Sequence, residues 1–509
     1  MKAATLRTFL SLHTWVGLLA GMLLFIAFYA GAITVFTHEL GDWQRPAAGR
    51  AAADPVGRSQ ALLDAVLEQP LEEGGVYLVL PGEHGPQPSV YWYDESRGEQ
   101  RRFVPDDVAV LEETPPRSGF VDFVYDLHFT AGLPRAFGTY LFGVVCILYG
   151  LALVSGVAIY APGFFKDLFA LRLGRNIKRL WQDAHNVVGM LSLPFHVVFA
   201  WSGAVLTIGI LLLAPFQSLV YDGKLMQVLE ADFEVAPHVA PAGVARPMLP
   251  VAELLRRAEA AVPGLRAEGI DFDNAGDANA RATVYGAVAQ RRLSNLAGVA
   301  LDATSGDVVA VSEPRRYTPG RALLYGLYTL HFGNFGEYAV KWLYFALGLA
   351  GAFLFYSGNL LWIEARRKRR QPEQPRRTRV MAALTLGVCL GCVAGVSAAF
   401  LAGALLPEAW APRLYFIVFF ASVAWAALRR PARAGHELLW LCALLTAAIP
   451  LAGWLGSGEH LPAAFVHGHW QRFFVDAIAL AMALVFWRMA RATLRRGSDG
   501  DPNSVWSLR

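Results

Sequence analysis

Long apolar runs alternate with polar stretches along this chain, and several of the runs match the thickness of a lipid bilayer. A helix needs roughly 20 apolar residues to cross about 30 Å of hydrocarbon. Runs of that length predict eight membrane-spanning helices, at residues 14–36, 137–160, 186–214, 338–363, 380–405, 411–428, 437–456 and 471–490.

Two long segments between the spans, residues 38–136 and 215–337, have a different pattern. Each contains a stretch of helical periodicity, SQALLDAVLEQ in the first and VAELLRRAEAAV in the second. Strand-like runs follow, among them SVYWYD and GVALDATSGDVVAV, the latter with a turn at residues 304–307. The sequence therefore predicts an α-helical integral membrane protein of about eight spans with two small external α+β domains.

The first span recurs in the third. An offset of 172 residues places His185 on His13, Gly189 on Gly17 and Gly203 on Gly31. A second match, at an offset of 203, joins the segments DLHF and TLHF that precede the second and fourth spans and contain His128 and His331. Those two spans also carry small-residue pairs, Ser-Gly at 155–156 and at 357–358. The unit of span, external domain and span thus occurs twice.

Composition and charge fit this organisation. Hydrophobic residues make up 55% of the 509 residues, which exceeds the content of ordinary soluble domains. The net charge of +4 comes with basic residues in the loops at 161–184, 364–379 and 429–433 and in the tail, so the positive-inside rule puts both termini in the cytoplasm. No nucleic-acid partner is needed to explain them. All four cysteines lie in predicted spans, which excludes a disulfide framework for the external domains.

These observations predict one order of parts along the chain. It runs as a first span at 1–37, an external domain at 38–136, spans at 137–160 and 186–214 around a cytoplasmic loop at 161–185, a second external domain at 215–337, a span at 338–363, a basic cytoplasmic loop at 364–379, a four-helix membrane extension at 380–492 and a cytoplasmic tail at 493–509.

The repeated histidines have the spacing that a haem protein requires. From His13 to Gly31 is 18 residues, or five turns and about 27 Å of helix, so both residues share one face. Gly17 and Gly189, one turn from each histidine, extend this stripe. Neutral imidazole ligates haem iron. The pattern favours an inner haem between His13 and His185, and an outer haem between His128 and His331.

Other uses of these residues remain open. A histidine at a membrane interface is commonly a capping or snorkelling residue, and a glycine stripe commonly serves helix packing. His196 breaks the symmetry, because Leu24 stands at its place in the first copy. It is a further candidate for haem binding, a residue of a proton or quinone path, or a donor to a carbonyl freed by Pro194.

Three histidines in one external connection, His460, His467 and His469, are few enough residues apart to bind a metal. An interfacial loop beside Trp470 is the interpretation we favour for them.

Several segments together resemble the PepSY-associated transmembrane helix family over about residues 5–365. They are RTFLSLHTWVGLLAG, the two LHF segments, DAHNVVGMLSLPFH, the small-Gly pairs and LDATSGDVVAV. The resemblance implies an iron-regulated protein of the bacterial inner membrane, similar to ferrisiderophore reductases. It implies two non-covalent b-type haems with bis-histidine ligation, a ferric siderophore or other ferric chelate as the periplasmic substrate, and a cytoplasmic reductant or quinol as the electron donor.

Two other functions stay possible at this point. The external domains could bind a peptide or regulate a protease without catalysis. Internal repeats are also common in transporters, although the spans carry charged residues only near their ends, such as Lys341, Glu437 and Asp476, which argues against ion-coupled transport.

Overall fold

A computed structural model describes most of the chain, as two compact units. Residues 1–48, 118–210 and 336–509 form the first unit, and residues 49–117 and 211–335 form the second. The described residues are 3–44, 54–68, 75–82, 88–94, 99–107, 110–113, 119–163, 172, 177–288, 293–367, 371 and 374–508. The basic residues Lys166 and Arg175 and the turn histidine His84 lie outside them.

The first unit is helical. Among the described residues, eight helical segments are long and apolar enough to cross a membrane, and they lie wholly or mostly in this unit. These spans are α1 (Ala3–Thr34), α5 (Arg135–Tyr160), α8 (Leu193–Leu219), α12 (Glu337–Ala365), α13 (Arg376–Leu405), α14 (Trp410–Leu428), α15 with α16 (Pro431–Ala447 and Ile449–Ser457) and α18 (Trp470–Asp499). The shorter helices beside them are α2 (Thr37–Gln44), α4 (Gly119–Thr130), α7 (Ile177–Leu191) and α17 (Leu461–His467), with a 3₁₀ turn at Ala161–Gly163. The predicted number of spans agrees with this count.

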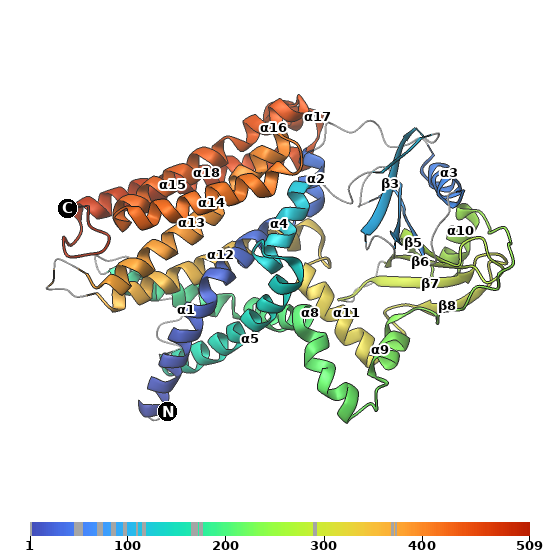
Figure 1. Ribbon diagram of the computed structural model, residues 1–509, viewed down its shortest axis with the longest axis horizontal. Helices are drawn as coiled ribbons and strands as arrows, with labels where there is room; N and C mark the ends of the chain where they lie inside the picture. The colour runs from blue at the N-terminus through green and yellow to red at the C-terminus, as the bar shows by residue number, and fades with distance from the viewer. Residues whose placement is uncertain are drawn as a thin grey trace. The chain divides into compact units, whose positions relative to one another are not determined.

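Helix α1 lies at the centre of the first unit, where it packs against α4, α5 and α12 (Figure 1). Helices α13 to α18, the orange and red part of the ribbon, form a layer of their own against it. Helix α13 is the most buried of the spans, since nearly every residue from Thr385 to Ala399 is inaccessible.

The third predicted span is two helices. Helix α7 ends at Leu191 and α8 begins at Leu193, where Pro194 lacks the amide hydrogen that an uninterrupted helix would use. His185 therefore lies on α7, which is amphipathic, and not inside the span itself. The two LHF segments are also helical, because His128 lies on α4 and His331 on α11 (Pro319–Phe332).

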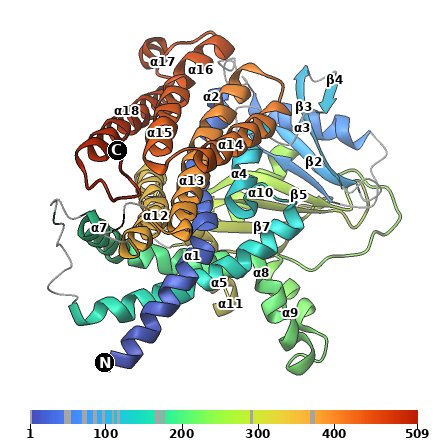
Figure 2. The same ribbon diagram turned by 60° about the vertical axis from the view of Figure 1, so that its left-hand side comes forward.

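The second unit contains one eight-stranded antiparallel sheet in the order β4-β3-β2-β1-β5-β6-β7-β8 (Figure 2). The strands are β1 (Val76–Val79), β2 (Ser89–Asp94), β3 (Glu99–Asp107), β4 (Val110–Glu113), β5 (Leu265–Asp273), β6 (Arg281–Val288), β7 (Leu296–Asp302) and β8 (Val308–Ser312). Each half is a four-stranded meander, and the halves join where β1 pairs with β5, with Leu78 opposite Ile270. The two predicted α+β segments thus share one sheet, and two separate domains are not seen.

One face of this sheet is covered by α3 (Pro55–Leu67) and α10 (Val251–Ala261), the two helices that the periodicity indicated. Leu62 and Leu254 are fully buried there against Ile270 and Phe272. The side-chain carbonyl of Gln60 on α3 accepts a hydrogen bond from the first amide of α10, at 2.7 Å. Helix α9 (Leu225–Phe233) completes the unit with α11. The turn predicted at residues 304–307 joins β7 to β8, and the carboxylate of Asp302 accepts hydrogen bonds from the amides of Thr304 and Ser305.

Candidate functional site

His13 on α1 is held by the second span. Its Nδ1 lies 2.9 Å from the backbone carbonyl oxygen of Ala152 on α5 and 3.3 Å from the hydroxyl oxygen of Ser155. A carbonyl oxygen can only accept, so Nδ1 carries the hydrogen and the neutral ring keeps a lone pair on Nε2. Gly156 lets the ring approach, because a Cβ there would stand 3.1 Å from the ring carbon Cε1.

His185 on α7 is held by the fourth span in the same way. Its Nδ1 lies 3.1 Å from the carbonyl oxygen of Leu354 on α12 and 3.3 Å from the hydroxyl oxygen of Ser357. A Cβ at Gly358 would stand 3.2 Å from its Cε1. The repeat inferred from the sequence therefore extends to individual contacts. The Ser-Gly pairs at 155–156 and 357–358 therefore lie directly against the two imidazoles.

The two rings are neighbours in an edge-to-face arrangement. Their centres are 6.2 Å apart and their planes are at 80°. Within the described part of the chain, neither Nε2 makes a hydrogen bond. Two imidazoles that ligate one metal ion from opposite sides, at a metal–nitrogen distance of about 2 Å, place their ring centres roughly 6.3 Å apart. At this separation His13 and His185 could together hold one metal ion, such as a haem iron. The side of Gly17 is open as well, since no described atom lies within 4 Å of where its Cβ would be.

His128 on α4 packs directly on α1. Its Nδ1 donates to the carbonyl oxygen of Ala27 at 2.8 Å, the same kind of contact that holds His13 and His185. A Cβ at Gly31 would lie 2.6 Å from this Nδ1 and 2.7 Å from Cε1, so a glycine is needed for the ring to reach the carbonyl. Gly31, which the spacing placed on the same helix face as His13, is thus the residue against which the His128 ring packs. Desolvation by burial lowers the pKa of His128 and so favours the neutral ring.

His331 belongs to the second unit and is described there alone. It lies in the last turn of α11, a helix that the side chain of Thr318 caps at its start and that Gly333 ends with a left-handed residue. Arg321 ties this helix to its own unit by donating to Ser312 Oγ and to the carbonyl oxygen of Glu234, both at 2.7 Å.

His196, the further candidate for haem binding, differs from His13 and His185 because both of its ring nitrogens are hydrogen-bonded to protein side chains. The side chain is fully buried on α8. Its Nδ1 is 2.5 Å from the hydroxyl of Tyr149, and its Nε2 is 2.8 Å from the hydroxyl of Ser192. Both ring nitrogens are therefore occupied by protein hydroxyls. The ring belongs to a cluster of aromatic side chains around Phe28 that fills the interior of the bundle.

The two remaining glycines of the stripe serve helix packing. A Cβ at Gly189 would stand 3.3 Å from the Leu354 side chain, and one at Gly203 would stand 2.7 Å from the sulfur of Cys146. The four cysteines are free thiols, and Cys389, Cys392 and Cys442 are fully buried, as the absence of a disulfide framework required.

The histidines of the last external connection form a satisfied ionic cluster. His467 and His469 both place Nδ1 on the buried carboxylate of Glu459, at 2.8 Å, and the ligand atoms of the three residues lie within 4.8 Å of one another. Three such groups could hold a divalent metal. Arg472 also lies 3.5 Å from Glu459 and already compensates its charge. His460 does not join them, because its ring caps the start of α17.

Comparison with known proteins identifies the family. A family model described as the PepSY-associated TM region matches residues 10–365. The chain belongs to this family. The match includes every residue of the histidine pairs and both halves of the eight-stranded sheet. It ends with α12, so α13 to α18 lie beyond it. Among relatives of the PepSY-associated protein is an uncharacterized protein of Pseudomonas aeruginosa, PA4219, which is 28% identical over 383 residues that cover 67% of this chain and 89% of the relative.

Proposed function

We propose that this PepSY-associated protein is a dihaem electron-transfer enzyme that reduces ferric iron, held by a siderophore or a similar chelate, at the periplasmic face of the bacterial inner membrane. The observation that carries the proposal is the pair of His13 and His185. These two repeat-related imidazoles are each fixed through Nδ1 by a backbone carbonyl, and their ring centres are 6.2 Å apart. Neither Nε2 makes a hydrogen bond to a described residue, so the two rings could together hold one haem iron.

In this proposal His13 and His185 would hold the inner haem, and His128 would be a ligand of the outer one. Haem bound by two imidazoles supplies one-electron transfer without a change of ligands. The chain's own contribution is orientation. The carbonyl oxygens of Ala152 and Leu354 fix the tautomer and the ring planes, a role that groups behind metal ligands commonly have. The aromatic cluster around Phe28 would exclude water from the part of the bundle between the two proposed haems.

The test is the absorption spectrum and haem content of the purified full-length protein. We expect a Soret band, α and β bands that sharpen with dithionite, and two haems per chain. His13→Ala and His185→Ala should each remove one haem and leave the other. His436→Ala is a matched control, because that ring also donates to a backbone carbonyl, Ala490 at 3.0 Å, but lies in the extension. A colourless protein, or two haems in both variants, would overturn the proposal.

A further inference from the structure

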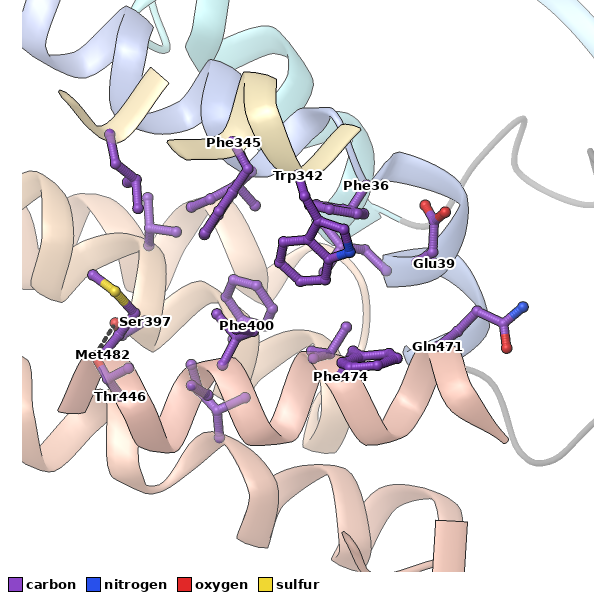
Figure 3. Close-up of a pocket in the computed structure, with 18 of the residues that line it drawn as sticks. Phe36, Glu39, Trp342, Phe345, Ser397, Phe400, Thr446, Gln471, Phe474 and Met482 are labelled. Carbon is purple, nitrogen blue, oxygen red and sulfur yellow. Dashed lines mark hydrogen bonds between the residues drawn. The ribbon is translucent and has the colours of Figure 1, made fainter. Parts of the chain in front are cut away.

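A groove of about 550 Å³ lies within the first unit, between the family region and the C-terminal extension (Figure 3). Helices α1, α2 and α12 form one wall, and α13, α15, α16 and α18 form the other. Trp342 and Phe345 face Phe400 and Phe474 across it. Small-molecule sites have volumes of roughly 300–1,000 Å³, so the groove is large enough for a ligand with a ring and a chain.

One end of the groove is polar and contains a carboxylate that is only half satisfied. Glu39 is 6% exposed, and its Oε1 accepts from Lys341 Nζ at 2.7 Å. Its Oε2 makes no geometric hydrogen bond to a described residue. The neighbouring Tyr338 side chain interacts with the same carboxylate and lines the same end of the groove. Gln471 lies at the same end (Figure 3). A buried acceptor in an apolar setting is costly to leave unpaired, so this end calls for a ligand that donates a hydrogen.

The polar groups at the far end of the groove are already paired with each other. Ser397 and Thr446 lie there, and their hydroxyls are hydrogen-bonded to each other at 2.9 Å. Beside the polar end, Tyr338, Trp470 and Phe474 line the groove and are exposed on the outer surface of the helices. Exposed tyrosine and tryptophan at helix ends are typical of the membrane interface. A ligand can therefore enter from the lipid.

We propose that this groove binds a membrane quinol, with its head group at Glu39 and its isoprenoid chain along the aromatic walls. The hydroquinone O–H supplies the donor that Glu39 Oε2 lacks. A phospholipid fits less well, because its anionic phosphate would lie against a carboxylate. The groove exists only where the extension packs on the family region, so the proposal also gives the extension a role.

This inference rests on the proposed function, because it names the electron donor of the same reaction. Oxidation of one quinol to quinone breaks two O–H bonds and releases two protons and two electrons. The electrons reduce two ferric ions to the ferrous state, and Glu39 accepts the first proton before it leaves to the periplasm.

The groove and the His128 contact lie on opposite faces of α1. Tyr29 and Ile33 line the groove, whereas Ala27 and Gly31, each two residues earlier, contact His128. Residues two positions apart point about 200° apart on a helix about 10 Å wide.

The test measures binding rather than turnover. Decylubiquinone and a short-chain naphthoquinone are titrated into the full-length protein in nanodiscs, and quenching of tryptophan fluorescence is followed, since Trp342 and Trp470 line the groove. We expect saturable quenching. Glu39→Gln should weaken binding by about tenfold or more, and Ala479→Phe, which fills the groove, should abolish it. Glu437→Gln, a glutamate at a span end outside the groove, should bind like the unmodified protein.

Quenching that does not saturate, or binding in Glu39→Gln and Ala479→Phe that equals that of the unmodified protein, would overturn the quinol site. Displacement of the quinone by added phospholipid at equal concentration would identify the groove as a lipid site and overturn it as well. The outcomes separate from those of the proposed function. A protein that reduces a ferric chelate with dithionite but does not bind quinone refutes only this inference, whereas saturable binding by a protein without haem refutes only the proposed function.

Discussion

Gly31→Ala tests the position of the His128 ring with little change to the rest of the fold. The new Cβ would stand 2.6 Å from Nδ1 of His128, whereas carbon and nitrogen atoms in contact are normally about 3.5 Å apart or more. The ring must therefore retreat by roughly 1 Å. That movement stretches its 2.8 Å hydrogen bond to Ala27 beyond the hydrogen-bonding range.

The expected change in stability is small, because two effects oppose each other. Loss of the hydrogen bond costs about 0.5–1.5 kcal/mol, and replacing glycine by alanine inside a helix gains about 1 kcal/mol. We expect thermal unfolding within about 1 kcal/mol of the unmodified protein, together with loss of one haem or a shifted low-spin spectrum. Haem is counted by the pyridine haemochrome assay, and the ligand field is followed by electron paramagnetic resonance.

Gly17→Ala is the matched control, since it adds the same methyl group to the same helix where no described atom lies within 4 Å. It should keep the outer haem. His128→Ala should reproduce the defect of Gly31→Ala, and the double variant should add little to either because both act on one contact. A Gly31→Ala protein with two haems and an unchanged spectrum would refute the assignment of this glycine as the seat of the ligand.

Two further predictions concern stability. Burial, and after it the nearby Asp273 carboxylate, raises the pKa of Asp271 in β5 to about 6. Between about pH 4 and pH 6 the native state therefore binds more protons than the unfolded chain. The stability of the fold falls as the pH rises through that window. Asp271→Asn should remove this fall, measured by thermal unfolding of the full-length protein at about pH 4.5 and about pH 7.5, and equal slopes in both proteins would contradict the argument. Trp43→Phe removes the 2.8 Å hydrogen bond to the fully buried carboxylate of Asp476 and should cost about 1–3 kcal/mol. Adding Asp476→Leu should recover part of that loss, and a double variant less stable than Trp43→Phe would be the opposite of what the structure predicts.

The spans and the repeat could be predicted because they depend on local signals. Bilayer thickness sets the length of an apolar run, and a common offset aligned His185 with His13 without any knowledge of contacts. The structure then adds that each ring is held by the following span, through Ala152 or Leu354. No sequence pattern identifies which backbone carbonyl accepts a hydrogen bond from a histidine. The nearby Ser-Gly pairs are the only sequence feature that marks these two positions.

The remaining features depend on partners far away in the chain. The pairing of β1 with β5 places Leu78 opposite Ile270. The alternation of apolar and polar residues predicts that both segments are strands, but it does not predict which strands pair with each other. His196 looked like a ligand because its own segment shows a histidine in an apolar run. Its real partner, the Tyr149 hydroxyl, comes from a different span. A polar group buried in a membrane bundle must find such a partner, but the sequence does not say which one.

The extension also has a structural task that follows from helix α4. This helix carries His128 on one side, and its opposite side is buried under α13 and α14. Phe120 packs against Gly403, where a Cβ would lie 2.7 Å away, and the Phe123 and Tyr415 rings are 5.1 Å apart. Because α4 is short, its own hydrogen bonds hold it weakly and packing must supply most of its stability. The extension therefore holds α4 against α1 through α13 and α14, and α13 also forms part of the groove wall.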